Sequence, residues 1–129
     1  MKIAVDFDGT CVDHDYPEVG KEVPNCVEVL KALDRRGDEL FLFTMRSGQG
    51  LRDAVQWFRE RDIHLSGIQQ DPAQSSWTQS PKCYAELYID DAAFGCPLIE
   101  VAGFKRPCVD WTKVEAELLC LKTSKELFS

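Results

Sequence analysis

The chain has 129 residues, a formal net charge of −7 and a hydrophobic content of 44%. This length suits one unit with a real core, so we expect residues 1–129 to form a single domain. The negative charge argues against broad nucleic-acid binding or attachment to an anionic membrane surface, and no apolar stretch is long enough to predict a membrane span.

The first distinctive stretch is an apolar run that leads into two aspartates. Residues 2–6 predict a strand that ends in Asp6, and Asp8 follows two positions later. Alternation along an extended strand places both carboxylates on one side, where they repel each other strongly unless a cation lies between them. Gly9 and Thr10 come next, and the N–H groups of such a turn can form a small anion-binding concavity. The stretch therefore indicates a divalent cation and an oxyanion such as phosphate, whereas an ordinary Asp-Gly turn would not need the second carboxylate.

Residues 11–23 have the composition of a polar loop. The loop leaves directly from the acidic motif, so we expect it to cover part of a site there. Cys11 or His14 could touch a substrate, although a solvated loop is the favoured interpretation. A helix is predicted next from its apolar spacing, and Asn25 with Glu28 has the spacing of a capping box at its start.

A second strand-and-helix unit follows. Residues 40–43 form a continuous apolar run, which suits a strand buried on both faces, and a helical apolar stripe comes after it. Thr44 stands at the strand end, where a hydroxyl near a helix N-terminus can donate to a phosphate oxygen. Met45 belongs to the same turn, and Arg46 can add positive charge. The alternative is a plain helix-capping turn with Ser47 as the cap.

Residues 63–68 predict a short third strand, and residues 69–81 predict a long irregular loop of a kind that is often functional. Trp77 is the apolar residue of that loop, and we interpret it as a plug into the core in preference to a stacking surface for substrate. Lys82 comes next. A lysine near the motif carboxylates would keep Asp6 charged and help to neutralise a phosphate, whereas an ordinary solvated lysine is the alternative.

Another apolar strand, residues 87–89, runs into Asp90 and Asp91 and so repeats the design of the first strand. Asp90 is the expected third protein ligand of the cation, with Asp91 binding through water or orienting Lys82, and the sequence leaves open which of the two leads. Residues 98–99 predict an edge strand, and Asp110 can cap a final helix whose terminal residues fray. Its inward-facing positions are Trp111, Val114, Leu118 and Leu121.

The chain contains six cysteines with irregular spacing and no C-x-x-C pair. Several fall in apolar patterns, so we interpret them as reduced and mostly buried, as expected for a cytoplasmic protein rather than for a disulfide framework. The N-terminal residues do not resemble a signal peptide. The cysteines are Cys11, Cys26, Cys83, Cys96, Cys108 and Cys120.

Alternation of strands with helical stripes predicts an α/β fold with a mainly parallel sheet, in which ligands gather at the carboxyl ends of the strands. The segment from Val5 to Thr10 resembles the first motif of the haloacid-dehalogenase-like phosphohydrolases. Three further signatures of that superfamily find matches in chain order, namely a hydroxyl residue (Thr44), a basic residue (Lys82) and an acidic pair (Asp90 and Asp91). The resemblance implies a three-layer Rossmann-like fold and Mg²⁺ as the cofactor.

The resemblance also implies a mechanism. Asp6 would attack phosphorus to form an aspartyl-phosphate, and Asp8 would act as general acid and then general base. The metal ligands would be Asp6, the backbone carbonyl of Asp8, and Asp90 or Asp91. A phosphotransferase or phosphomutase on the same scaffold, and a non-enzymatic receiver-like phospho-acceptor, remain alternatives. The residues that would hold the phosphoryl group are Gly9, Thr10, Thr44, Met45, Arg46 and Lys82.

Many relatives in that superfamily carry a cap domain, inserted after the first motif or between the second and third. Here the connections between the motifs are too short for a folded domain with its own core, so we expect a capless enzyme with an open site. The partner would be a bulky phosphorylated substrate, or a phosphorylated small molecule enclosed by a neighbouring subunit of a homo-oligomer or by residues 11–23 and 69–81.

Overall fold

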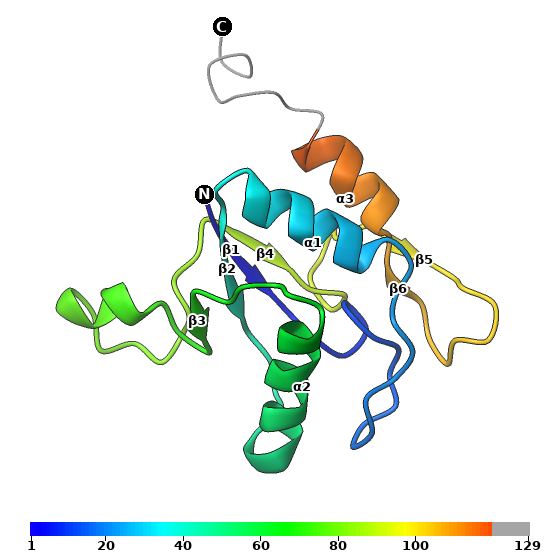
Figure 1. Ribbon diagram of the computed structural model, residues 1–129, viewed down its shortest axis with the longest axis horizontal. Coiled ribbons are helices and arrows are strands. Elements are labelled where there is room, and N and C mark those ends of the chain that lie inside the picture. Colours follow the sequence, from blue (N-terminus) through cyan, green and yellow to red (C-terminus); the bar gives the residue numbers. More distant parts are fainter. Residues whose placement is uncertain (120–129) are drawn as a thin grey trace, which may run out of the picture.

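The first strand, β1 (Lys2–Val5), lies inside a four-stranded sheet whose order is β3-β2-β1-β4 (Figure 1). The structure is a computed structural model that describes residues 1–119. Every pairing in this sheet is parallel, and β1 pairs with β2 (Glu39–Leu42) on one side and β4 (Leu87–Ile89) on the other. The edge strand is β3 (Gly67–Ile68). The predicted α/β class with a parallel sheet is confirmed.

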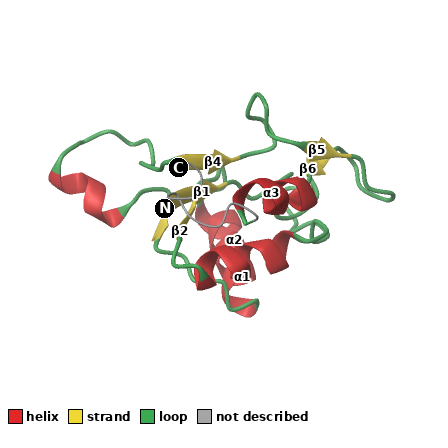
Figure 2. Cartoon of the chain, turned by 90° about the horizontal axis from the view of Figure 1, so that it is seen from above, coloured by secondary structure: helices red, strands yellow, loops and turns green. Residues whose placement is uncertain are grey.

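Three helices cover one face of this sheet (Figure 2). They are α1 (Cys26–Arg35), α2 (Gly48–Glu60) and α3 (Trp111–Leu118). Their buried side chains join one apolar cluster with alternate strand residues such as Ile3 and Val5. On the other face, Ala4 and Phe41 are buried against Cys83. Within residues 1–119 no α-helix packs there, so the expected third layer is a short irregular segment before β4.

The start of α1 differs from the prediction. Asn25 precedes the helix with a φ of +65°, and its side chain makes no capping hydrogen bond. Instead its Nδ2 donates to Thr112 Oγ1 at 2.8 Å. Cap residues usually have an extended backbone, which aims the side chain at the first free N–H groups of the helix. The predicted capping box of Asn25 and Glu28 is therefore wrong, because the left-handed backbone turns the side chain towards α3.

The region between α2 and β4 contains less strand and more turn than predicted. Only Gly67 and Ile68 pair with β2, and residues 72–76 form a 3-10 helix, η1 (Pro72–Ser76). Asp71 begins η1, and its side chain accepts a hydrogen bond from Ala73 N. Trp77 is 64% exposed, with its ring edge-on to Tyr84, so the predicted core plug is wrong. The buried residue of η1 is Gln74, whose side chain bonds four backbone groups.

The elements after β4 agree more closely with the predictions from the sequence. β5 (Leu98–Ile99) pairs antiparallel with β6 (Cys108–Val109), a strand the sequence did not predict. Asp110 caps α3 as predicted, by accepting from Lys113 N at 3.3 Å. Within α3, Trp111 and Val114 are buried, and Leu118 packs against the core. The predicted positions of Leu121 and Cys120, and the frayed end, lie outside the described residues.

Four cysteines of residues 1–119 are buried and one is partly exposed, and all five are free thiols, as expected. No helix in this part of the chain has the length and apolar content that crossing a membrane requires. The connections between β1 and β2 and between β2 and β4 hold only the elements named above, which agrees with the absence of a cap. The five cysteines are Cys11, Cys26, Cys83, Cys96 and Cys108.

Candidate functional site

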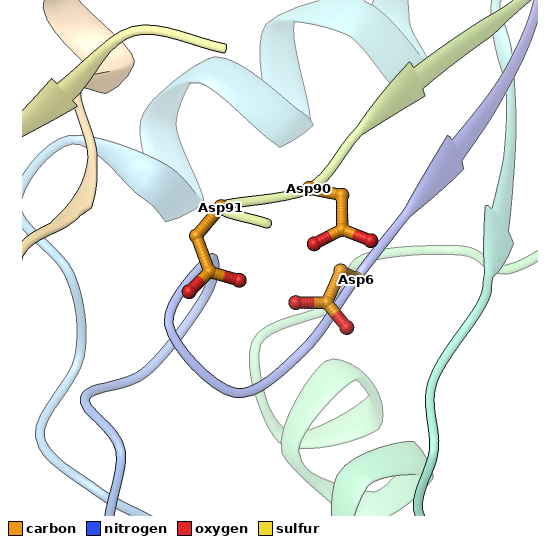
Figure 3. Close-up of side chains that lie close together, drawn as sticks. All are labelled: Asp6, Asp90 and Asp91. Atoms are coloured by element: carbon orange, nitrogen blue, oxygen red, sulfur yellow. The ribbon is translucent and has the colours of Figure 1, made fainter. Parts of the chain in front are cut away.

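Three carboxylates meet at the carboxyl edge of the sheet (Figure 3). β1 and β4 are direct neighbours in register, and Asp6 N donates to Ile89 O at 3.0 Å just beyond the last strand pair. Asp6 and Asp90 therefore leave adjacent strands at the same height, with Asp91 beside them. One oxygen of each carboxylate lies within 4.8 Å of those of the other two. The predicted convergence of the two acidic motifs thus has a direct cause in the register of the sheet.

This crowding changes the protonation of Asp6. Burial, the charge of Asp90 and a hydrogen bond with Asp91 raise the pKa of Asp6 from 3.8 to about 8, while the hydroxyl of Thr10 opposes the rise. A nearby divalent cation would reverse the effect, because it stabilises the carboxylate. Three half-buried carboxylates are also the hard oxygen donors that Mg²⁺ and Ca²⁺ prefer. The donor set therefore fits such an ion.

Thr10 ties the two acidic motifs together. Its hydroxyl donates to Asp6 Oδ2 at 3.0 Å and accepts from Asp91 N at 3.1 Å, and its own carbonyl accepts from Trp111 Nε1 at 2.7 Å. The residue is fully buried. The Thr10 side chain therefore fixes the carboxylates relative to each other, and both of its hydrogen bonds are used within the protein.

The N–H groups of the acidic turn divide into two sets. Gly9 and Thr10 donate theirs to carbonyls of the same turn, at 2.7 and 3.1 Å, so neither N–H is available to an anion in this structure. By contrast, no hydrogen bond within residues 1–119 uses the N–H groups of Phe7, Asp8 or Met45. The N–H groups of the turn that remain without a partner are thus two or one residues before those that the sequence suggested, and Met45 adds one from the next loop.

Gly9 and His14 fix the other side of the cluster. Gly9 has a φ of +85°, and a Cβ there would overlap the Asp91 carboxylate and the His14 imidazole. His14 Nε2 lies 2.9 Å from Asp91 Oδ2, and the imidazole is largely covered. The favoured interpretation of residues 11–23 as a merely solvated loop is therefore wrong at this point. His14 brings the loop onto the acidic cluster, whereas contact of Cys11 or His14 with a substrate stays a prediction.

Asp8 does not join the other three carboxylates. Its two oxygens accept from Arg46 Nε and Nη2, both at 2.8 Å, in a bidentate pair. Arg46 is only 2% exposed, and the hydrogen bonding that it donates to Asp8 raises the pKa of Arg46. Arg46 thus faces Asp8 and not an open phosphate position, and the sequence contained no signal for this pairing.

Gln69 is a site residue that the sequence did not indicate. It follows β3 with a φ of +67°, and its amide group bonds both backbone groups of Thr44, at 2.8 Å to the N–H and 2.6 Å to the carbonyl. Thr44 Oγ1 accepts from Arg46 N at 3.1 Å, which leaves the hydroxyl proton free to donate. Gln69 therefore fixes the loop that carries Thr44. The sequence contains no pattern that predicts this contact between Gln69 and Thr44.

Lys82 lies on the sheet face from which the carboxylates project. Its ammonium is 5.2 Å from the centre of the Tyr88 ring. Asp90 is two residues beyond Tyr88, and Asp6 is two beyond the paired residue Ala4, so all four side chains share that face. Within residues 1–119 no ion pair joins Lys82 to either carboxylate. Its assignment as the basic site residue stays a prediction.

Beyond Gln69, which bonds the Thr44 loop, the loop of residues 69–81 lies away from the acidic cluster. Asp71 forms an ion pair with Lys2, the first residue of β1, and so sits near the amino edge of the sheet. Asp6 lies at the opposite edge. In this structure, of the two loops considered from the sequence, only residues 11–23 border the acidic cluster.

The comparison with solved structures gives a match over the whole chain. A conserved protein from Bacteroides thetaiotaomicron is 34% identical, with a TM-score of 0.78, and the match covers 100% of this chain and 98% of that one. The chain belongs to the same family as this conserved protein. The description of the Bacteroides protein names no activity, so membership of the family assigns none. A scan of protein-family models and a search of curated proteins found no match.

Proposed function

We propose that this protein is a Mg²⁺-dependent phosphohydrolase of the haloacid-dehalogenase-like class that cleaves a phosphate monoester through an aspartyl-phosphate on Asp6. The observation that carries the proposal is the convergence of Asp6, Asp90 and Asp91 at the carboxyl edge of a parallel sheet. Holding three carboxylates together costs free energy unless a cation binds them, and fold stability alone gives no reason for the arrangement.

The metal would be held by Asp6, Asp90 and the backbone carbonyl of Asp8. Asp90 is the proposed direct ligand, because it follows β4 directly beside Asp6. Asp91 is already bonded to His14 through one oxygen. When bound, Mg²⁺ supplies positive charge that keeps Asp6 ionised and neutralises a phosphate oxygen.

The phosphoryl group would be bound by the N–H groups without an internal partner, those of Phe7, Asp8 and Met45, and by the free hydroxyl proton of Thr44. Phe7 and Asp8 directly follow Asp6, and Thr44 and Met45 follow the neighbouring strand β2, so all four donors come from the same edge of the sheet. Phosphoryl transfer depends mainly on such positioning and charge stabilisation. Lys82 would add positive charge from the helix-free face of the sheet.

The residues that form bonds or transfer protons in the reaction are then Asp6 and Asp8. A carboxylate oxygen of Asp6 forms a bond to phosphorus while the bond from phosphorus to the ester oxygen breaks, and the leaving oxygen takes up a proton. Water then attacks the acyl phosphate and regenerates Asp6. Asp8 suits the second step in its present state, because a carboxylate can accept a proton from that water. Donation of a proton in the first step requires one bond to Arg46 to loosen.

The rim of the site supports a bulky substrate. Three loops leave the carboxyl edge, and each carries an exposed apolar side chain: Tyr16 at 68%, Met45 at 98% and Phe94 at 109% of full exposure. A small polyol phosphate would find few hydrogen-bonding side chains there, whereas a larger molecule with apolar surface would contact all three loops.

A direct test is release of inorganic phosphate from a panel of sugar, nucleotide, aryl and nucleic-acid-end phosphates with Mg²⁺. Wild-type protein should turn over at least one class, and EDTA should abolish the activity. Asp6→Asn is the matched control, since it keeps the shape but lacks the nucleophile. Borohydride trapping should locate the acyl phosphate at residue 6. Full activity in folded Asp6→Asn would exclude the mechanism.

The pairing of Asp8 with Arg46 favours one second candidate, a non-enzymatic phospho-acceptor similar to a receiver domain. Such a protein also needs an acidic cluster and a cation, but it does not need a free general acid at Asp8. Incubation with a small phosphodonor separates the two functions. A phosphohydrolase loses the label from Asp6 within each catalytic cycle, whereas a phospho-acceptor keeps it and releases no more than one phosphate per chain.

A further inference from the structure

We propose that Arg46 is a positioning residue that couples residues 15–18 of the loop to Asp8, so that the loop and this carboxylate keep or lose their positions together. The coupling itself stands without the proposed activity. Its catalytic consequence, that the loop helps to set the position of Asp8, rests on the proposed function.

The hydrogen bonds of Arg46 define the coupling. A guanidinium group has five N–H donors. Two of them bond Asp8, at 2.8 Å each. Two others reach the loop, at 2.7 Å to Glu18 O and 3.3 Å to Pro17 O, and the fifth lies 3.4 Å from Gly50 O in α2. Every donor is therefore used, and the set is shared almost equally between the acidic motif and the loop.

Stacking of aromatic rings on the Arg46 guanidinium also connects the acidic motif to the loop. The guanidinium carbon lies 5.1 Å from the centre of the Phe7 ring and 5.1 Å from that of Tyr16. Phe7 is a fully buried residue of the acidic motif, whereas Tyr16 belongs to the loop and is 68% exposed. Arginine stacks well on aromatic faces, so the two rings fix the plane in which Arg46 meets Asp8.

In the part of the chain that the structure describes, only the hydrogen bonds of Arg46 connect residues 15–18 to Asp8. Within residues 1–119, the carboxylate of Asp8 accepts only from Arg46, and residues 15–18 reach the acidic motif only through the same guanidinium. His14 contacts Asp91 independently. Asp15 is also ion-paired with Lys105. Removing the charge of Asp8 should therefore loosen residues 16–18, while the contacts of His14 with Asp91 and of Asp15 with Lys105 remain.

Amide hydrogen exchange tests the coupling without any assay of activity. Glu18 N donates to Asp15 O at 2.9 Å, so its exchange reports opening of the loop tip. In Asp8→Asn the side-chain amide places a donor against Arg46 and breaks at least one of the two bonds. Exchange at Glu18 should then become about tenfold faster, the change that a local loss of one charge-assisted hydrogen bond produces.

Asp90→Asn is the matched control, because it makes the same chemical change at a residue that, within residues 1–119, has no hydrogen bond or ion pair with Arg46 or with residues 15–18. Exchange at Glu18 should stay as in wild type. The coupling is refuted if folded Asp8→Asn leaves Glu18 exchange unchanged, or if Asp90→Asn accelerates it equally. Both variants keep the buried arginine, so neither removes a core side chain.

A double-mutant cycle tests the catalytic consequence on the best substrate of the phosphate panel. Tyr16→Leu removes the exposed stacking ring and should lower kcat roughly two- to tenfold in wild type, but much less in an Asp8→Asn background. Equal losses in both backgrounds would refute the catalytic part. If no substrate is turned over, the proposed function fails, and the exchange experiment still decides the coupling.

Discussion

The acidic cluster leads to an unusual prediction for the metal-free protein: Asp6→Asn should make it more stable. Folding raises the pKa of Asp6 from 3.8 to about 8. Between these values the native state holds a proton that the unfolded chain has released, so the free energy of unfolding of the wild type falls as pH rises from about 4 to about 8. Asparagine carries no proton to lose, and the variant should lack this fall.

The size of the effect follows from the shift. One pKa unit corresponds to about 1.4 kcal/mol, so the full shift of roughly four units sets an upper limit of about 6 kcal/mol. Asp6 and its neighbours are partly exposed, and their relaxation and bound counter-ions reduce the penalty. We expect Asp6→Asn to exceed wild type by about 2–4 kcal/mol at pH 8 and to differ little at pH 4.

Urea unfolding in EDTA at several pH values measures this difference directly. Adding Mg²⁺ at about 1,000 times its Kd should then reverse the order, because it stabilises wild type by about 4.1 kcal/mol and binds the variant more weakly. Parallel pH profiles of the two proteins in EDTA would refute the reasoning, since they would mean that the cluster imposes no ionisation cost on Asp6.

Three further predictions concern residues around the site. Thr10→Val should destabilise the protein by about 2–3 kcal/mol in urea unfolding, because the partly buried N–H of Asp91 loses its acceptor. Thr10→Ser keeps a hydroxyl group and should recover most of the loss. Equal stability of all three proteins would contradict this. Gln69→Leu should lower kcat/KM by about tenfold or more without unfolding the chain, since the Thr44 loop loses its support, and unchanged kinetics would count against that role. Asp71→Asn should cost about 1–2 kcal/mol at pH 7 with activity intact. The hydrogen bond from Lys2 lowers the pKa of Asp71, so this contribution is present above the unfolded value of 3.8 and disappears as pH falls through the lower folded value; a difference that persists at pH 2 would be the wrong outcome.

The acidic cluster could be predicted because its position depends on strand ends alone. Asp6 and Asp90 each follow a short apolar strand, and parallel strands end at a common edge, so the pattern was enough to bring the two residues together. The same reasoning placed Thr44 at the neighbouring strand end. No detail of loop conformation enters these arguments.

Contacts between loops could not be predicted in this way. The pairing of Asp8 with Arg46 joins side chains 38 positions apart, and that of Gln69 with Thr44 joins residues 25 apart. Both depend on the path of the chain after a strand ends, and Gln69 adopts a backbone conformation that its residue type does not favour. The prediction for Trp77 was wrong for a related reason. Its apolar side chain suggested burial, but Trp77 follows the short η1 turn and is exposed.

The central place of β1 has a consequence for how the protein is made. Val5 pairs with Leu42 and with Ile89, so β1, which precedes both partner strands in the chain, completes its pairing only when β4 has left the ribosome. Nascent chains that stop before β4 already contain Asp6, but they lack the other two carboxylates of the acidic cluster. The proposed ion site therefore cannot form before β4 joins the sheet, and a chain that is truncated or stalled before β4 cannot acquire it.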